Sequence, residues 1–249
     1  MFDLTGRTAL VTGASGGLGM HFAHVLAARG ATVTLGARRA GALDEACRAI
    51  RATGGSAVAV DLDVTDQASV EAAVASIDGG PDILVNNAGI SGGGSAIEMD
   101  EAEWDRVLDT NLKGVFLAAQ AAARAMRDSG RGGAIVNIAS ILGIRVAGGV
   151  SAYSASKAAT IQLTKSLALE WARYGVRVNA LCPGYVETDI NRDFFATSAG
   201  EALVRRIPMR RLARPEELDA ALLLLVCAEG SYITGTTLAV DGGHLVSSL

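Results

Sequence analysis

Cysteine, proline, histidine and aromatic residues are all scarce in this chain. Its 249 residues include three cysteines, four prolines and three histidines, and only 4% of them are aromatic. Cys47, Cys182 and Cys227 are far apart and form no CxxC pair, which argues against a disulfide framework and a zinc site. His21 and His24 stand three residues apart, but no cysteine or carboxylate completes a ligand set. We therefore expect three buried, reduced thiols and no metal site.

Long apolar runs and an excess of positive charge are also missing. The longest apolar stretch, residues 220–228, has about half the length that a membrane-spanning helix requires. The first residues lack the charged region followed by an apolar region that marks a secretory signal. The net charge of -4 gives no basic surface of the kind that nucleic-acid-binding proteins carry. The sequence predicts a cytoplasmic protein that binds a small neutral or anionic metabolite, and neither a membrane nor nucleic acid.

Glycine and a regular alternation of segments are what the chain has in abundance. Thirty glycines indicate tight turns and close backbone approaches. Short β-rich runs alternate with longer alanine-rich amphipathic runs, which is the pattern of βαβ units. We expect strands at 8–11, 32–36, 57–61, 83–86, 134–139, 177–182 and 237–240, and helices near 17–29, 41–53, 67–77, 102–128, 152–173 and 215–227. The prediction is a single α/β domain over residues 1–249, with a doubly wound sheet of about seven parallel strands and helices on both faces.

The residues that could carry chemistry follow the expected strands. In an open parallel sheet, ligands bind beyond the carboxyl ends of the strands. A glycine-rich turn follows the first strand, and the next five strands are followed by Arg38, Asp63, 87–89, Ser140 and 183–188. We therefore expect these segments to meet along one edge of the sheet.

The glycine-rich turn between the first strand and the first helix has the sequence Thr12-Gly13-Ala14-Ser15-Gly16-Gly17-Leu18-Gly19. Glycines let the backbone approach a pyrophosphate, and the exposed N–H groups at the start of a helix bind its charge. The turn favours a dinucleotide ligand and a Rossmann-type fold. A merely structural turn is the alternative.

The end of the second strand bears on the type of dinucleotide. It lacks the acidic residue that would bind a ribose 2′-hydroxyl. Arg38 and Arg39 stand there instead, and a guanidinium pairs well with a 2′-phosphate. This favours NADP(H), with NAD(H) as the alternative, unless the arginines form a solvated turn. Asp63 either binds the adenine amino group or caps the third helix, for which Thr65 and Asp66 are further caps.

Tyr153, Lys157 and Ser140 combine an acid, a cation and a hydroxyl. If the run around Tyr153 is helical, Lys157 lies on the same face at position i+4. A free tyrosine has a pKa of about 10 and needs a neighbour that favours the phenolate to act as an acid or base at neutral pH. Singly, each residue could be a packed or solvated side chain or a cap. Their joint occurrence with the dinucleotide turn favours a catalytic role.

Taken together, these motifs resemble the short-chain dehydrogenase/reductase family, almost from end to end. The TGxxxGxG turn of that family matches 12–19, and its NNAG element matches 86–89. Its PG motif matches 183–184, and the ending at 232–235 and 240–243 resembles tetrameric members, including 3-oxoacyl-carrier-protein reductases. Its catalytic tetrad matches Asn111, Ser140, Tyr153 and Lys157.

The resemblance implies hydride transfer between nicotinamide C4 and a ketone or secondary alcohol, with Tyr153 as the general acid/base. Ser140 would then polarise the substrate oxygen, Lys157 would lower the pKa of Tyr153 and bind the ribose, and Asn111 would position a water. Gly16 departs from the family, because many NADP-using members carry a basic residue there, which leaves the preference to Arg38. The implied cofactor-binding residues are Gly13, Ser15, Gly17, Leu18, Gly19, Arg38, Asp63, Val64, Asn87, Ala88, Gly89, Tyr153, Lys157, Pro183, Gly184, Val186 and Thr188.

The substrate and the assembly are less well determined. We expect a substrate loop at about 185–212, and substrate contacts from Ser140, Leu142, Tyr153 and Tyr185. An NADPH-dependent carbonyl reductase is favoured. A sugar or polyol dehydrogenase, a hydroxysteroid-type dehydrogenase and a non-catalytic dinucleotide sensor are the alternatives. Apolar residues on more than one face of 102–128 and 152–173 predict a homotetramer or homodimer.

Overall fold

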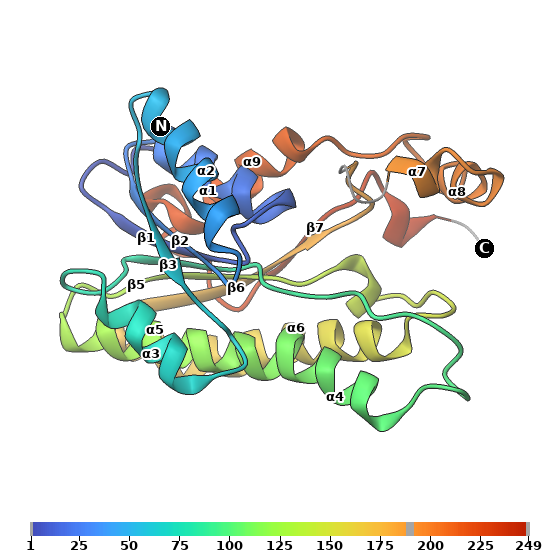
Figure 1. Ribbon diagram of the computed structural model, residues 1–249, viewed down its shortest axis with the longest axis horizontal. Coiled ribbons are helices and arrows are strands. Elements are labelled where there is room, and N and C mark those ends of the chain that lie inside the picture. The colour runs from blue at the N-terminus through green and yellow to red at the C-terminus, as the bar shows by residue number, and fades with distance from the viewer. Residues whose placement is uncertain (1, 188–191, 248–249) are drawn as a thin grey trace.

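The computed structural model describes residues 2–187 and 192–247 (Figure 1). Its strands are β1 (Thr8–Thr12), β2 (Thr32–Ala37), β3 (Ser56–Asp61), β4 (Ile83–Asn86), β5 (Gly133–Ile138), β6 (Val176–Pro183) and β7 (Thr237–Val240). They pair in parallel in one seven-stranded sheet with the order β3-β2-β1-β4-β5-β6-β7. The predicted doubly wound parallel sheet is confirmed, and no strand end departs from its expected position by more than one residue.

The helices that connect the strands are α1 (Gly17–Ala28), α2 (Ala40–Ala52), α3 (Gln67–Ala75), α4 (Glu101–Leu108), α5 (Gly114–Asp128), α6 (Ser151–Trp171), α7 (Arg192–Phe195), α8 (Ser198–Val204) and α9 (Asp219–Val226). The single helix expected over 102–128 is interrupted, because a π-helical turn, Asp109–Lys113, separates α4 from α5. Two short helices, α7 and α8, occupy part of the expected substrate loop. Within the described residues, no helix has both the length and the apolar character needed to cross a membrane.

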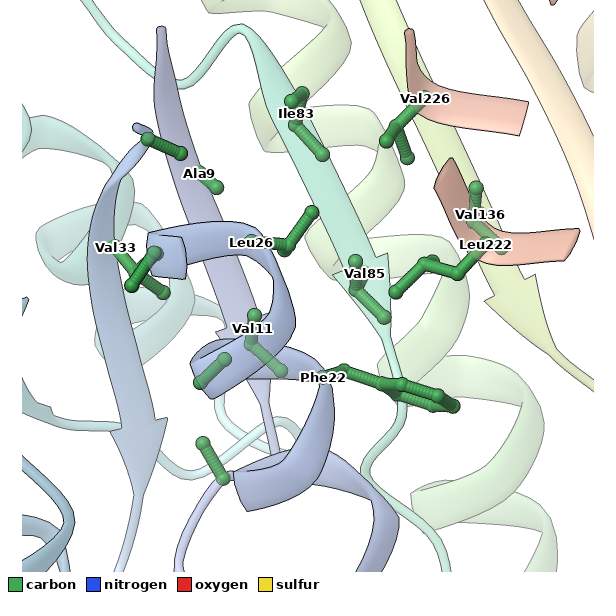
Figure 2. Close-up of a cluster of buried hydrophobic side chains, with 14 of the residues drawn as sticks. Ala9, Val11, Phe22, Leu26, Val33, Ile83, Val85, Val136, Leu222 and Val226 are labelled. Carbon is green, nitrogen blue, oxygen red and sulfur yellow. The ribbon is translucent and has the colours of Figure 1, made fainter. Parts of the chain in front are cut away.

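Two layers of helices cover the sheet, one on each face (Figure 1). In the layer formed by α1, α2 and α9, Phe22 and Leu26 of α1 pack against Val11 of β1 (Figure 2). In the other layer, α3, α5 and α6 pack against Leu10 and Leu84, which point to the opposite face of the sheet. Because successive side chains of a strand alternate between the two covered faces, the central strands β1, β4, β5 and β6 are buried along almost their whole length.

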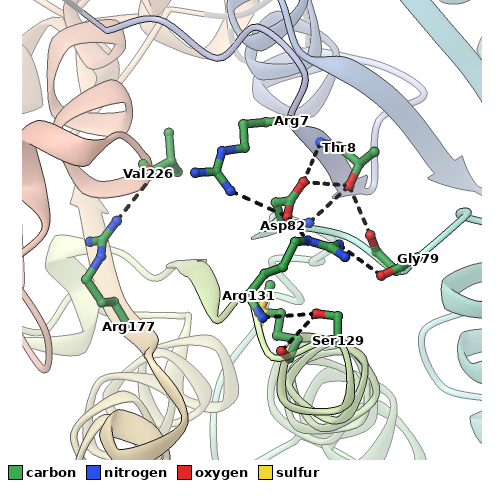
Figure 3. Close-up of polar contacts among 10 residues, drawn as sticks. Arg7, Thr8, Gly79, Asp82, Ser129, Arg131, Arg177 and Val226 are labelled. Carbon is green, nitrogen blue, oxygen red and sulfur yellow. Dashed lines mark hydrogen bonds and ion pairs between the residues drawn. The ribbon is translucent and has the colours of Figure 1, made fainter.

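Asp82 ties the amino ends of two central strands together. Its Oδ2 accepts the backbone N–H of Thr8 in β1 at 2.9 Å, and its Oδ1 accepts Nε of Arg131 at 3.0 Å (Figure 3). Arg7 adds a longer ion pair of 3.6 Å. Burial raises the pKa of Asp82, but the hydrogen bonds from Thr8 and Arg131 outweigh it and hold the pKa below its usual value. This edge of the sheet is therefore fixed by structural contacts.

The strand order of the sheet has a switch point between β1 and β4, and the loops at the carboxyl ends of these strands lie opposite the contacts of Asp82. From β1 the chain goes to β2 and β3 on one side, whereas β4 to β7 follow one another on the other side. Loops leave in opposite directions at such a point and open a crevice beyond the carboxyl ends of the strands. The glycine-rich turn after β1 and the segment after β4 border this crevice, so the fold brings the predicted site residues to one place.

Candidate active site

The glycine-rich turn packs directly against the segment that follows β4. A Cβ on Gly13, whose φ is +65°, would stand 2.7 Å from the Cα of Ala88, and one on Gly19 would stand 2.4 Å from the Gly13 carbonyl oxygen. Asn87 Nδ2 donates to the carbonyl oxygens of Thr12 and Gly13, at 3.1 and 3.3 Å. Thr12 Oγ1 in turn accepts the N–H groups of Asn87 and Ala88. These contacts explain why the two motifs occur together.

The first turn of α1 is open toward a cavity of about 470 Å³. The helix begins after Gly16 without a side-chain cap, and nothing lies within 4 Å of the position that a Cβ on Gly17 would take. Uncapped N–H groups at the start of a helix form an anion site. The shape and the donors of this turn therefore fit the pyrophosphate of a dinucleotide.

Two arginines border the far end of this cavity. The Arg38 side chain is 72% exposed, and its Nη1 lies 3.8 Å from Asp63 Oδ2. Arg39 folds back over the glycine-rich turn, where its Nη2 and Nε donate to Ser15 Oγ at 2.9 and 3.2 Å. The sequence prediction assigned most of the 2′-phosphate preference to Arg38, and Arg39 of the same pair also lines this cavity.

Asp63 forms a turn of its own instead of capping α3. Its Oδ1 accepts the backbone N–H of Thr65 at 2.9 Å and its hydroxyl at 2.7 Å. Hydrogen bonds from Thr65 lower the pKa of Asp63, and the charge of Arg38 adds a smaller effect. The cap of α3 is Asp66, whose side chain accepts the N–H of Ala68. The alternative that Asp63 caps α3 is therefore wrong, whereas the prediction that Asp66 caps this helix is correct.

Tyr153, Lys157 and Ser140 meet in a second cavity of about 320 Å³. Lys157 Nζ lies 5.6 Å from the centre of the Tyr153 ring and donates to the carbonyl oxygen of Ile138 at 2.8 Å. Ser140 Oγ accepts the N–H of Leu142 at 3.1 Å, so it caps the short 3-10 turn that follows β5. The i, i+4 placement on α6 is as expected, and both side chains line this cavity.

The charge states of these residues depart from expectation. Burial raises the pKa of Tyr153, and a hydrogen bond with Ser140 only partly opposes this effect. Burial also lowers the pKa of Lys157 to about 8. The expected lowering of the Tyr153 pKa by Lys157 is therefore not found, because desolvation of the phenolate outweighs other effects. Cys182, which sequence reasoning left aside, lies near Lys157, and burial raises the pKa of its thiol to about 11.

Asn111 occupies the π-helical turn and is fully buried. Its Oδ1 accepts the N–H of Ile90, and its Nδ2 donates to the Ile90 carbonyl oxygen, both at 2.8 Å. Nδ2 also donates to Ser156 Oγ at 3.1 Å, and the Asn111 carbonyl oxygen accepts Thr160 Oγ1 at 3.2 Å. Asn111 thus joins the segment after β4 to α6, one turn from Lys157.

The two cavities are parts of one groove, because Asn87, Gly89 and Ile90 line both. Of the predicted residues, Gly13, Ser15, Gly17, Arg38, Asp63, Val64 and Ala88 line the first cavity, and Leu18, Ser140, Tyr153, Lys157, Pro183, Gly184, Tyr185 and Val186 line the second.

Some predicted residues lie outside the lining of the groove. Gly19 lies beneath the turn, where a Cβ would meet the Gly13 carbonyl oxygen. Leu142 is not among the lining residues of either cavity, and Thr188 lies outside the described residues. Thr110 lines the first cavity and was not predicted, because no motif marks it.

The residues set aside at the sequence level have structural contacts. Cys47, Cys182 and Cys227 are buried with free thiols, as predicted. His21 Nε2 lies 2.7 Å from Asp219 Oδ1, which joins α1 to α9. Over residues 2–187 and 192–247, no group of three His, Cys, Asp or Glu side chains gathers in a metal-binding arrangement.

Comparison with known proteins agrees with this geometry. The family described as Enoyl-(Acyl carrier protein) reductase matches residues 13–244. The chain belongs to the short-chain dehydrogenase/reductase family, and it is an oxidoreductase. This confirms the resemblance that the motifs suggested.

Three relatives illustrate the range of the family around this chain. Gluconate 5-dehydrogenase of Gluconobacter oxydans (strain 621H) is 41% identical over 99% of this chain and 98% of its own length. Galactitol 2-dehydrogenase (L-tagatose-forming) of Cereibacter sphaeroides is 44% identical over 99% of this chain and 98% of its own length. The structure of a gluconate 5-dehydrogenase from Burkholderia cenocepacia J2315, in complex with NADP and tartrate, superposes with a TM-score of 0.94 at 37% identity and covers 99% of this chain and 98% of that one.

Proposed function

We propose that this protein is an NADP(H)-dependent oxidoreductase that interconverts a secondary alcohol and a ketone, with Tyr153 as the general acid/base. The observation that carries the proposal is the continuous groove from the uncapped start of α1 to the cavity of Ser140, Tyr153 and Lys157. A binding-only sensor needs the first half of this groove but has no use for a buried phenol in the second half.

Each residue of the second cavity has a defined task in this proposal. A bound nicotinamide would supply or accept the hydride. Ser140 and Tyr153 hold the substrate oxygen between two hydroxyl groups, and Tyr153 gives the proton in reduction or takes it in oxidation. Lys157 binds the ribose from its position beside Gly89, since a Cβ on Gly89 would stand 3.6 Å from Lys157 Nζ. Asn111 holds the segment after β4 against α6 and positions a water for proton exchange.

The preference for NADP(H) is assigned to Arg38 and Arg39 together. Arg39 contacts Ser15 beside Gly16, the position where many NADP-using relatives carry a basic residue of their own. Arg38 stands across the cavity beside Asp63. Two guanidinium groups on either side of a cavity suit a phosphate dianion better than a neutral hydroxyl. The NADP in the Burkholderia relative supports this assignment.

We place the substrate among small hydroxy or keto compounds of the kind for which two of the relatives described above are named. Gluconate and galactitol are polyhydroxylated, which supports the sugar or polyol alternative. A carbonyl reductase acting on such compounds satisfies the same site. The segment 185–212 would then contact the substrate, since it contributes Tyr185 and Val186 to the cavity.

The decisive experiment compares Tyr153→Phe with the wild type. NADPH oxidation is followed by absorbance over a panel of sugar ketones, keto acids and aryl ketones, and NADPH affinity is measured by fluorescence titration. We expect Tyr153→Phe to bind NADPH as the wild type does and to lose more than about 100-fold in kcat. Tyr232→Phe, at a fully exposed tyrosine, is the matched control. Turnover retained in Tyr153→Phe would refute the assigned role.

We also propose a homotetramer or homodimer in the cytoplasm. Leu169 of α6 is 82% exposed, and a groove between α5 and α6 is lined by Phe116, Leu163 and Trp171. Such an apolar helix face favours burial against a second copy. Light scattering should give a multiple of 25.4 kDa for the wild type and a smaller mass for Leu169→Arg, whereas the control Ile97→Arg should assemble normally. Free, buried thiols suit a reducing compartment.

A further inference from the structure

The loop that follows Ser140 carries a partly buried arginine, Arg145. Its Nη1 donates to the carbonyl oxygen of His244 and, at 3.2 Å, to Ser247 Oγ. These two contacts connect the loop after β5 to the carboxyl-terminal segment, about a hundred residues further along the chain. They hold the guanidinium in place but leave most of its donors unused, because an arginine has five N–H groups.

Arg145 has no anionic partner within the described residues. No carboxylate there lies within 4.0 Å of its nitrogen atoms, and its Nε and Nη2 donate to none of the described groups. The carboxylate of Asp241, whose charge only partly opposes the lowering of the His244 pKa by burial, does not pair with Arg145. It accepts the backbone N–H groups of Gly243 and Leu245, at 2.9 and 2.7 Å. Removing a cation from water without pairing it is unfavourable. A guanidinium with a free edge is suited to a carboxylate, which it binds with two parallel hydrogen bonds.

Arg145 is connected to the cavity of Ser140 and Tyr153 through His244 and Tyr185. The ring of His244, whose carbonyl oxygen Arg145 holds, lies 5.5 Å from the ring of Tyr185, and Tyr185 lines that cavity. Burial raises the pKa of Tyr185, and the positive charge of Arg145 opposes this rise. Phe195 adds an edge-to-face contact with Tyr185, with 5.8 Å between the ring centres. The rings thus form an apolar wall with a cation at one end.

We propose that Arg145 is a specificity-determining residue that binds the carboxylate of an anionic substrate, so that the protein acts on hydroxy acids and the corresponding keto acids. The inference rests on the proposed alcohol–ketone chemistry and narrows it to substrates with a carboxylate remote from the reacting carbon. Ser140 and Tyr153 hold the reacting oxygen, the wall of Tyr185, Phe195 and His244 covers the carbon skeleton, and Arg145 fixes the far end.

The test uses pairs of substrates that differ only in charge. The reduction of 4-oxocyclohexanecarboxylate and of its methyl ester by NADPH is measured for the wild type, Arg145→Gln and Arg145→Lys. We expect the wild type to prefer the acid and Arg145→Gln to lose roughly 10- to 100-fold in kcat/KM for the acid, mainly through KM. The loss for the ester should be much smaller, and Arg145→Lys should restore part of the preference. Equal use of acid and ester by the wild type, or equal losses in Arg145→Gln, would overturn the inference.

A matched control separates recognition from structural support. Ser247→Ala removes a contact of Arg145 with the carboxyl-terminal segment and leaves the charge in place. We expect this variant to keep the wild-type ratio of acid to ester. If the ratio falls in Ser247→Ala as it does in Arg145→Gln, the contact with the terminal segment is the cause and the inference fails.

A binding measurement keeps this inference distinct from the proposed function. Cyclohexanecarboxylate has no reacting group, so its calorimetric binding to the NADPH-loaded protein does not depend on turnover. We expect binding to the wild type and a loss of binding in Arg145→Gln. Absence of turnover with intact, Arg145-dependent binding would refute the proposed chemistry alone, whereas equal binding to both proteins would refute the role of Arg145 alone.

Discussion

The two arginines at the far end of the groove allow the cofactor preference to be predicted quantitatively. Arg38 is largely exposed and already lies 3.8 Å from Asp63, so part of its charge is offset and water screens the rest. We expect it to contribute about 1 kcal/mol to binding of a 2′-phosphate, which is below the usual contribution of a charged hydrogen bond and typical of an exposed ion pair. Arg39 is held by Ser15 through two nitrogen atoms. Because less side-chain freedom remains to be lost, its contribution should reach about 1.5 to 2 kcal/mol.

These contributions translate into separate kinetic effects. Each 1.4 kcal/mol corresponds to a factor of ten, so Arg38→Ala should raise the KM for NADPH about 5-fold and Arg39→Ala about 10- to 30-fold. The double variant should raise it roughly 50- to 150-fold if the two effects add. The KM for NADH should change little, because its ribose hydroxyl carries no charge. Arg48→Ala, at an exposed arginine of α2 outside the groove, is the control.

The assay is an initial-rate measurement with NADPH and NADH at a saturating concentration of one ketone. The informative quantity is the ratio of kcat/KM for the two cofactors, because damage to the fold lowers both values and leaves the ratio unchanged. Raising the salt concentration should weaken the effect of Arg38 more than that of Arg39, since screening acts on the exposed group. An unchanged ratio in the double variant would show that the 2′-phosphate binds elsewhere.

Three further predictions concern stability and pH. Asp82→Ala should destabilise the protein by about 2 to 3 kcal/mol in urea unfolding, because the half-buried N–H and hydroxyl of Thr8 and the guanidinium of Arg131 lose their acceptor; the exposed control Asp78→Ala should stay within about 0.5 kcal/mol. Gly19→Ala, whose Cβ would stand 2.4 Å from the Gly13 carbonyl oxygen, should cost about 1 to 3 kcal/mol and weaken NADPH binding, and wild-type values would contradict the packing. Because the pKa of Tyr153 is raised, ketone reduction should be flat between about pH 6 and 9 while alcohol oxidation rises with pH; a fall in reduction through this range would refute the direction of that shift.

The central strands were predictable from the sequence because they are buried on both faces, whereas β3 and β7 are partly exposed and were recognised by their β-rich composition. An apolar run such as that of β4 needs no tertiary information to be recognised, and the following polar residues then mark the functional edge. The tetrad residues were located by motif, although only Ser140 directly follows a strand, whereas Asn111 lies in the π-helical turn and Tyr153 and Lys157 lie on α6. The order of the strands in the sheet decides which strand ends lie side by side. Because βαβ units with a glycine-rich turn restrict that order strongly, the position of the site was also predictable.

The features that sequence reasoning missed depend on contacts between distant segments. The π-helical turn at Asp109–Lys113 surrounds Asn111, whose partners come from the segment after β4 and from α6. Arg39 is directed toward Ser15 by the path of the chain after β2, whereas adjacent Arg38 points toward Asp63. A charge pattern cannot distinguish these two directions. The Tyr153 pKa was misjudged because spacing reveals a neighbouring lysine but says nothing about burial.

Burial of Tyr153 and Lys157 determines the protonation state of the site before the cofactor binds. Tyr153 stays a neutral phenol, and Lys157, with a pKa of about 8, is mostly protonated near neutral pH. In this state the site already holds the proton that reduction of a ketone requires, so reduction needs no prior change of charge. Oxidation of an alcohol requires the phenolate, which becomes favourable only when positive charge is added next to Tyr153. A bound oxidised nicotinamide carries such a charge, whereas the reduced form does not. The same buried tyrosine can therefore serve both directions, with the acid form matched to the reduced cofactor and the base form to the oxidised one.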